Sequence, residues 1–229
     1  MMTDALVAHS SEIEKANFYK KTYLHVALSI LAFIGVETVL LNVVPVELIA
    51  MMFGQKYTWL LIIGVFWLAS ILANKWSLSQ SRSTQYLGLG FYIVLEAVIF
   101  LPLLYMAVGY SGGGTVIFQA AMLTIAMFAG LSLVAFTSKK DFSFLRNIII
   151  IGGFLSLGLI VAGAIFGFNL GLWFSVGMVV LASASILYET SKLKNVYTTN
   201  QYVGASLQLF ASIMLLFWYI LRILMSRRS

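Results

Sequence analysis

The sequence predicts an all-α membrane protein with seven transmembrane helices, and two observations carry that prediction. Of the 229 residues, 61% are hydrophobic and only 10% are charged, whereas soluble domains contain about 25% charged residues. Seven apolar segments are also long enough, or nearly so, to cross a bilayer core that needs about 20 helical residues. We therefore expect one seven-helix domain over residues 21–229, preceded by a polar cytoplasmic tail over residues 1–20.

The predicted spans cover residues 23–44, 57–73, 86–108, 115–136, 144–166, 170–188 and 202–224. The first follows Lys20 and Lys21 and serves as its own insertion signal, because the N-terminus lacks the basic-then-apolar layout of a cleaved signal peptide. The second is the shortest. Three residues separate the fifth from the sixth, so a tight turn is expected there. Gly163 and Gly167 have the GxxxG spacing of close helix contacts, within one chain or between two copies, which leaves the oligomeric state open.

Basic residues alternate from one connection to the next. They occur before the first span, between the second and third, between the fourth and fifth, and between the sixth and seventh. The positive-inside rule then places the N-terminus in the cytoplasm and, after seven spans, the C-terminus outside. The basic tail at Arg227 and Arg228 leaves the alternative that the seventh segment does not fully cross, but early helices usually set the orientation. The net charge of +6 is scattered beside apolar spans, which favours contact with lipid headgroups over nucleic-acid binding.

Three glutamates, Glu37, Glu96 and Glu189, lie within the predicted spans. A charge at the centre of a spanning helix costs about 2.5–3.5 kcal/mol, so such a residue is neutral, paired, or next to a polar cavity. Glu37 and Glu96 either share a proton or are separately hydrogen-bonded. Glu189, three residues before Lys192, is either an interfacial partner of that lysine or an inward-facing carboxyl that titrates.

The residues available for catalysis and metal binding are few. Cysteine is absent, the two histidines lack metal-ligand spacing, and no GxSxG motif occurs. Both aspartates, Asp4 and Asp141, lie outside the spans, which excludes an intramembrane protease that uses two aspartates. We therefore predict a protein that is not an enzyme and binds no metal or cofactor, with Ca²⁺ only as an ion that it could transport.

Three segments resemble the Bax inhibitor-1 family. Residues 129–133 with 137–145, which include Lys139, Lys140, Asp141 and Phe142, are similar to the exit of the family's fourth helix. Residues 186–191, which include Tyr188, Glu189 and Thr190, are similar to the end of its sixth helix. Residues 202–212 are similar to its last helix, and the resemblance as a whole runs from about Lys21 to the end.

The resemblance implies a fold in which the last of seven helices is surrounded by the other six. It also implies that, in calcium-leak members, two aspartates near the cytoplasmic ends of the last two helices share a proton and act as a pH-sensitive latch. The matching positions here are Glu189 and Ser212. Since a hydroxyl cannot supply the second charge, the usual latch is not expected in this chain.

Glu189 followed by Thr-Ser, together with Ser212, resembles the bacterial YccA-like branch of the family. That resemblance implies an inner-membrane protein that binds an FtsH-type AAA protease, restrains it and is degraded from its N-terminal tail. The protease would then bind the start of the tail, at Met1, Met2, Thr3 and Asp4. The alternative is a pH-sensitive calcium or cation leak, or a proton-coupled transporter, that uses Glu37, Glu96 and Glu189.

Overall fold

A computed structural model describes residues 6–54, 56–109, 113–138 and 140–226. Seven of its helices are long and apolar enough to cross a membrane, which confirms the predicted number of spans for this part of the chain. The elements, in chain order, are η1 (Val7–His9), α1 (Glu12–Val43), α2 (Val46–Gly54), α3 (Lys56–Ser77), α4 (Arg82–Gly109), α5 (Gly113–Thr137), α6 (Leu145–Phe166), α7 (Gly171–Asn195) and α8 (Tyr202–Ser226).

Helix α1 begins eleven residues before the predicted first span, so most of the second half of the expected tail is helical. The cause is a capping box at its start. The Ser11 side chain accepts a hydrogen bond from the Glu14 backbone, and the Glu14 side chain accepts one from the Ser11 backbone, which together satisfy two backbone donors that a helix start leaves free.

Two further elements differ from the sequence prediction. Helix α2, of nine residues, is too short to cross a membrane and was not predicted. Helix α3 has 22 residues, so the second span is longer than the segment 57–73.

The predicted tight turn between α6 and α7 is present. Gly167 adopts a left-handed conformation, with φ of 77°, that glycine tolerates best, and its backbone N–H bonds to the carbonyl of Gly163.

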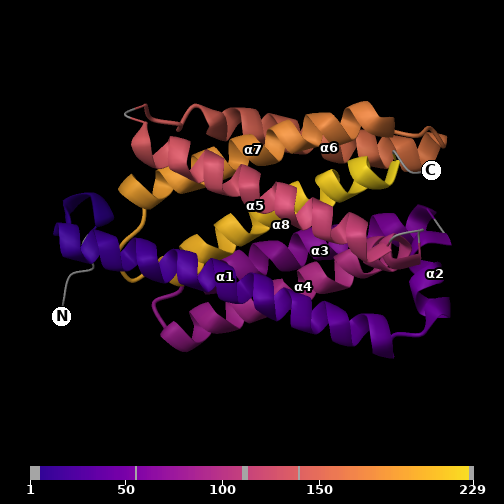
Figure 1. Cartoon of the computed structure of the whole chain (residues 1–229), viewed down its shortest axis with the longest axis horizontal. Helices are drawn as coiled ribbons and strands as arrows, with labels where there is room; N and C mark the ends of the chain where they lie inside the picture. The colour runs from indigo at the N-terminus through magenta and orange to yellow at the C-terminus, as the bar shows by residue number, and fades with distance from the viewer. Residues whose placement is uncertain (1–5, 55, 110–112, 139, 227–229) are drawn as a thin grey trace.

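Helix α8 runs through the middle of the bundle (Figure 1). It packs against α1, α3, α4, α5 and α7, and its side chains are buried on several sides, among them Leu209, Phe210, Leu216 and Leu221. Helix α6 instead packs on α7 and α3, and buries only Leu145 and Gly163. The last helix is thus surrounded by five of the other six long helices, whereas the family resemblance implies all six, and α6 lies at the periphery.

Helices α3 and α4 approach each other closely at Gly88. A Cβ atom at this position would lie 2.7 Å from the Ala73 carbonyl oxygen and 2.7 Å from the Ser77 backbone nitrogen. At Gly90, two residues further on, nothing lies within 4 Å of such an atom. Only a glycine therefore permits the observed contact between these two helices at residue 88.

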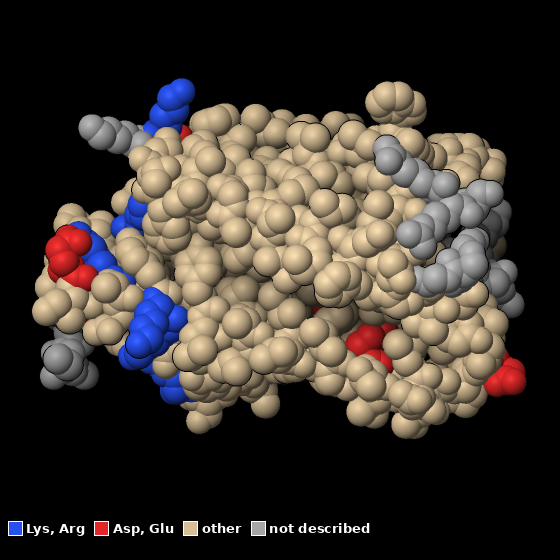
Figure 2. All heavy atoms as spheres, viewed as in Figure 1, with Lys and Arg blue, Asp and Glu red and all other residues tan. Residues whose placement is uncertain are grey.

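The lysines and arginines visible in Figure 2 gather at one end of the molecule, the left-hand end, whereas acidic side chains also appear toward the other end. We call this the basic end. It holds the start of α1 and the α3–α4, α5–α6 and α7–α8 connections, together with the lysines and arginines that the sequence places there. The start of α1 and the end of α8 lie at opposite ends (Figure 1), as an odd number of spans requires.

Candidate functional site

Glu189 lies in the last two turns of α7, on the stripe that faces the bundle, and is 8% exposed. Its Oε2 atom accepts a hydrogen bond from Lys192 Nζ at 2.8 Å and a longer one from the Tyr197 hydroxyl at 3.4 Å. The Lys192 ammonium also lies over the rings of Tyr188 and Tyr197, 5.2 and 5.3 Å from their centroids. The helix spacing that pairs Glu189 with Lys192 is therefore realised, and this carboxylate has a fixed cation.

Tyr197, in the connection between α7 and α8, is 4% exposed. Burial, first, and the neighbouring Glu189 carboxylate raise the pKa of its hydroxyl well above the ordinary value for tyrosine. Its phenol therefore stays a hydrogen-bond donor to Glu189 throughout the physiological pH range. Sequence reasoning missed Tyr197, because its contact with Glu189 depends on how the connection folds back over the end of α7.

Residues 6–10, which we call the N-terminal strap, cover this connection at the basic end. The Val7 backbone N–H donates to the Tyr197 carbonyl at 2.9 Å, and Leu6 forms an antiparallel bridge with Thr198. The Val7 side chain is fully buried. The strap thus holds the loop whose tyrosine contacts Glu189. In the sequence, the strap is indicated only indirectly. The capping-box residues Ser11 and Glu14 mark where α1 begins, and therefore where the strap ends.

Ser212, the second position of the family latch, has a different partner. Its hydroxyl bonds to the Ser185 hydroxyl at 2.8 Å and donates to the Gln208 carbonyl at 3.0 Å. Ser185 lies one turn before Glu189 on α7, so the serine pair and the ion pair occupy successive turns. In the described helices no hydrogen bond joins Ser212 to Glu189. The two latch positions therefore carry an ion pair and a hydroxyl pair, neither of which is a pair of acids.

Glu96 is 5% exposed and lies midway along α4, one turn after the buried Tyr92. It lines a cavity of about 690 Å³ between α3, α4, α6, α7 and α8. Ser185, Ser212 and Arg222 line the same cavity. The structure thus brings Glu96 and Ser212 to one space, a connection that the linear sequence does not reveal.

Glu37 lies elsewhere, on the buried stripe of α1, and is 4% exposed. Both of its carboxyl oxygens are buried without a hydrogen-bond partner in the part of the chain described here. It does not line the cavity of Glu96. The proposed sharing of a proton between Glu37 and Glu96 is therefore not seen, since no hydrogen bond joins these two residues.

The other residues of the family resemblance lie at the basic end. Lys140, Asp141 and Phe142 are in the connection between α5 and α6, where Asp141 Oδ1 accepts from the Ser143 backbone and hydroxyl at 3.0 and 2.6 Å. These hydrogen bonds lower the pKa of Asp141. Lys139 and the tail residues Met1, Met2, Thr3 and Asp4 lie outside the described residues.

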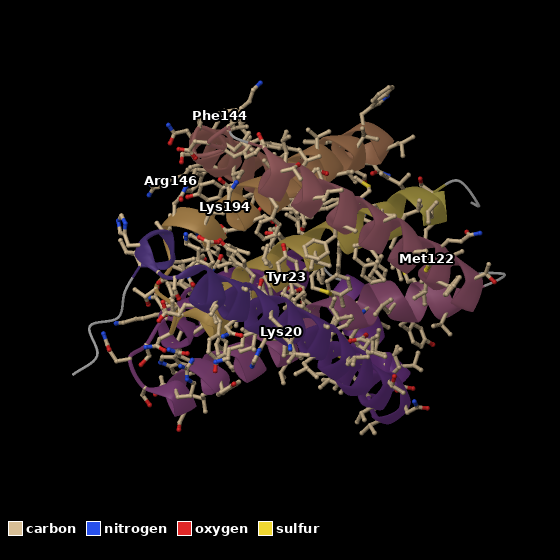
Figure 3. The ribbon with its side chains drawn as sticks, turned by 60° about the vertical axis from the view of Figure 1, so that its left-hand side comes forward. Lys20, Tyr23, Met122, Phe144, Arg146 and Lys194 are labelled. Carbon is tan, nitrogen blue, oxygen red and sulfur yellow. The ribbon has the colours of Figure 1, made fainter. Side chains whose placement is uncertain are left out.

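Helix α7 is tied to this connection by Lys194, which donates to the carbonyl of Ala135 at 2.7 Å and to that of Ser138 at 3.3 Å. Figure 3 shows Lys194, Arg146 and Phe144 together near this end, whereas Met122 lies toward the other end of the molecule. A cation at the end of α5 also interacts favourably with the helix dipole. The α5–α6 connection and the end of α7 therefore form one unit.

Thr190 adjoins Glu189 and is fully buried. The Tyr23 hydroxyl on α1 lies near the Thr190 hydroxyl and near that of Ser132 on α5, and none of the three oxygens has a partner of hydrogen-bond geometry within the described ranges. Tyr23 points from α1 into the bundle (Figure 3). The three hydroxyls have the polar partners that a bridging water requires.

In the described part of the chain, no three acidic or histidine side chains cluster in a way that could hold a metal ion.

Known proteins are similar in sequence to this chain over part or most of its length. The model of a protein family described as "Inhibitor of apoptosis-promoting Bax1" matches residues 15–229. An uncharacterized protein of Pseudomonas aeruginosa is 39% identical over 53% of this chain, and an uncharacterized membrane protein of Vibrio cholerae is 35% identical over 54%. Each alignment spans 55% of the relative, about half of its length.

A third relative aligns over almost the whole chain. Protein LIFEGUARD 3 of Arabidopsis thaliana is 26% identical over 94% of this chain and 87% of its own length. The family match covers all seven long helices except for the first three residues of α1. The chain is therefore a multi-pass membrane protein that belongs to the Bax inhibitor-1 family.

Proposed function

We propose that this protein modulates a membrane-bound FtsH-type AAA protease in a bacterial inner membrane. The observation that carries the proposal is the state of the two latch positions. Glu189 is held by Lys192, and Ser212 is bonded to Ser185. This combination resembles the YccA-like branch, and it leaves the basic end closed by contacts that do not require a shared proton.

The strap gives this proposal a physical basis. A protease that grips residues 1–5 must next pull on residues 6–10, which are bonded to the α7–α8 connection and bury Val7. Immediately behind them, α1 packs along α4 and α8. The chain would thus present a short terminal segment for the protease to bind, followed by a firmly packed segment, so an engaged protease would be occupied without rapid extraction of the bundle.

The test is co-expression with a tagged FtsH-type protease, followed by capture in mild detergent and measurement of the turnover of another membrane substrate. We expect co-purification and slower turnover. Deletion of residues 2–5 should abolish the slowing, whereas deletion of residues 227–229, a matched change at the other terminus, should preserve it. Absence of association together with unchanged turnover would remove the proposal.

A cation leak is the second candidate, and one observation favours it. Glu96 lines a cavity in the middle of the bundle together with Ser212, as an ion path would require. Calcium entry into dye-loaded liposomes that contain the purified protein, at acidic and neutral pH, tests it. Flux that falls in Glu96→Gln would support the leak, and flux equal to that of empty liposomes at both pH values would exclude it.

A further inference from the structure

The cavity that holds Glu96 is bounded by helices that differ in burial. Helix α8 forms its inner wall, with Gln208, Ser212 and Trp218. On the outer side, Trp67 of α3 and Phe154 of α6 line the cavity although they are 51% and 66% exposed. A residue that both lines a cavity and is exposed lies at its rim. The cavity therefore opens between α3 and α6, on the lateral surface that faces lipid in a membrane.

Glu96 is the acidic residue of this cavity, and it has no cation of its own. The ion pairs among the described residues join Lys15 to Glu12 and Lys192 to Glu189. Its position midway along α4 places it far from the headgroups on either side. A carboxylate at this depth is stable only if it is neutral or if a cation reaches it from the cavity.

The walls around Glu96 are aromatic. Trp59, Tyr92, Phe100 and Trp218 all line the cavity. Trp59 and Trp218 are stacked with centroids 6.2 Å apart, and Phe100 meets Trp218 edge to face at 4.9 Å. Aromatic faces attract organic cations and provide apolar contact area at the same time. The volume of about 690 Å³ is within the range of about 300–1,000 Å³ of small-molecule sites.

Arg222 lines the cavity further along α8. Phe100, one turn beyond Glu96, stacks on Phe217, and Arg222 lies five residues beyond Phe217. It is therefore about 13 Å from the level of Glu96 along the helix axes, too far for a direct ion pair. Its charge opposes the entry of small hydrated cations from that end. A cation that enters through the apolar lateral opening does not pass it.

We infer that this cavity binds a lipophilic organic monocation, with the positive charge against Glu96 and the apolar groups against the aromatic walls. An ammonium of a phospholipid headgroup carries the same charge, but it resides at the membrane surface and not at the depth of Glu96. The inference concerns a site separate from the Glu189 and strap region, and it does not rest on the proposed modulation of a protease.

The test uses tetraphenylphosphonium as the probe and the full chain in nanodiscs of phosphatidylcholine, with empty discs to subtract partition into lipid. Equilibrium dialysis should give saturable binding of one probe per chain. Glu96→Gln should weaken that binding at least tenfold. Glu37→Gln removes the other deeply buried carboxyl, which lies outside the cavity, and should bind as the unmodified protein does.

One comparison does not depend on the folding of a variant. Tetraphenylborate has nearly the same size and shape with the opposite charge, and in a separate dialysis it should show no saturable binding to the unmodified protein. Equal binding of both ions, or equal phosphonium binding by Glu96→Gln in a folded state, would overturn the inference.

Discussion

Replacement of Lys192 with Met tests whether the Glu189 ion pair stabilises the basic end. Methionine keeps the length and apolar stem of lysine but removes the charge. Glu189 would then retain only the 3.4 Å contact with Tyr197. A buried carboxylate that loses its cation must either keep an uncompensated charge or take up a proton, and both lower the stability of the folded state.

The magnitude follows from the exposure of the two side chains, 19% for Lys192 and 10% for Glu189. Exposed pairs contribute about 0–1 kcal/mol, and removal of one partner from a fully buried pair costs about 3–5 kcal/mol. Lys192→Met, which removes one partner from a pair between these limits, should lower the free energy of unfolding by about 2–3 kcal/mol. Glu189→Gln should cost less, about 1 kcal/mol, because the remaining lysine can extend to the headgroups.

The assay is the free energy of unfolding in mixed micelles, titrated with a denaturing detergent and followed by tryptophan fluorescence. Lys75→Met serves as a control, because Lys75 is an exposed lysine at the same end that makes no ion pair among the described residues; it should change the stability by less than about 0.5 kcal/mol. The double variant should be close to Glu189→Gln alone. Losses that simply add, or a Lys192→Met protein as stable as Lys75→Met, would refute the reasoning.

Three further outcomes are expected. Gly88→Ala should destabilise the protein by about 1–3 kcal/mol, because its Cβ meets the backbone of α3, whereas Gly90→Ala should stabilise it by about 0.5–1 kcal/mol; the same detergent titration measures both, and equal effects would contradict the close α3–α4 contact. Val7→Asp places a charge at a fully buried position, so hydrogen exchange of the N-terminal strap should become faster without unfolding of the helices, and unchanged exchange would disprove its role in holding the loop. Ser143→Ala should raise the pKa of Asp141 in an NMR titration, since Ser143 supplies the hydrogen bonds that lower it. A lowered carboxyl pKa contributes stability above the unfolded-state pKa that is lost as the pH falls through the folded-state value, so that small contribution should shrink in the variant.

The seven spans were predictable because length and apolarity decide whether a helix can cross a membrane, and both are properties of a single segment. The short elements were not. Helix α2 has too few residues to give a clear pattern, and the strap is ordered through contact with the α7–α8 connection, which is distant in sequence. The start of α1 was signalled by Ser11 and Glu14, although the apolar pattern begins only further along the helix.

The same division holds for the candidate site. The pairing of Glu189 with Lys192 follows from a spacing of three residues on one helix, so it could be read from the chain. Tyr197 could not be assigned, because a loop residue reaches Glu189 only when that loop is folded. Nor could the environment of Glu96, whose cavity needs five helices to enclose it. Contacts within one helix were thus accessible to sequence reasoning, and contacts between elements were not.

The three intramembrane glutamates have different surroundings, and these surroundings indicate different roles. Glu189 has a lysine and a tyrosine, so its charge is already compensated and it stabilises the end of α7. Glu37 is enclosed with no partner for either oxygen, a state that favours the uncharged acid. Glu96 alone of the three lines a cavity with a lateral opening. A ligand or ion that needs a carboxylate can therefore reach Glu96 without rearrangement of the helices, whereas at Glu37 and Glu189 the packing or the ion pair must first be broken.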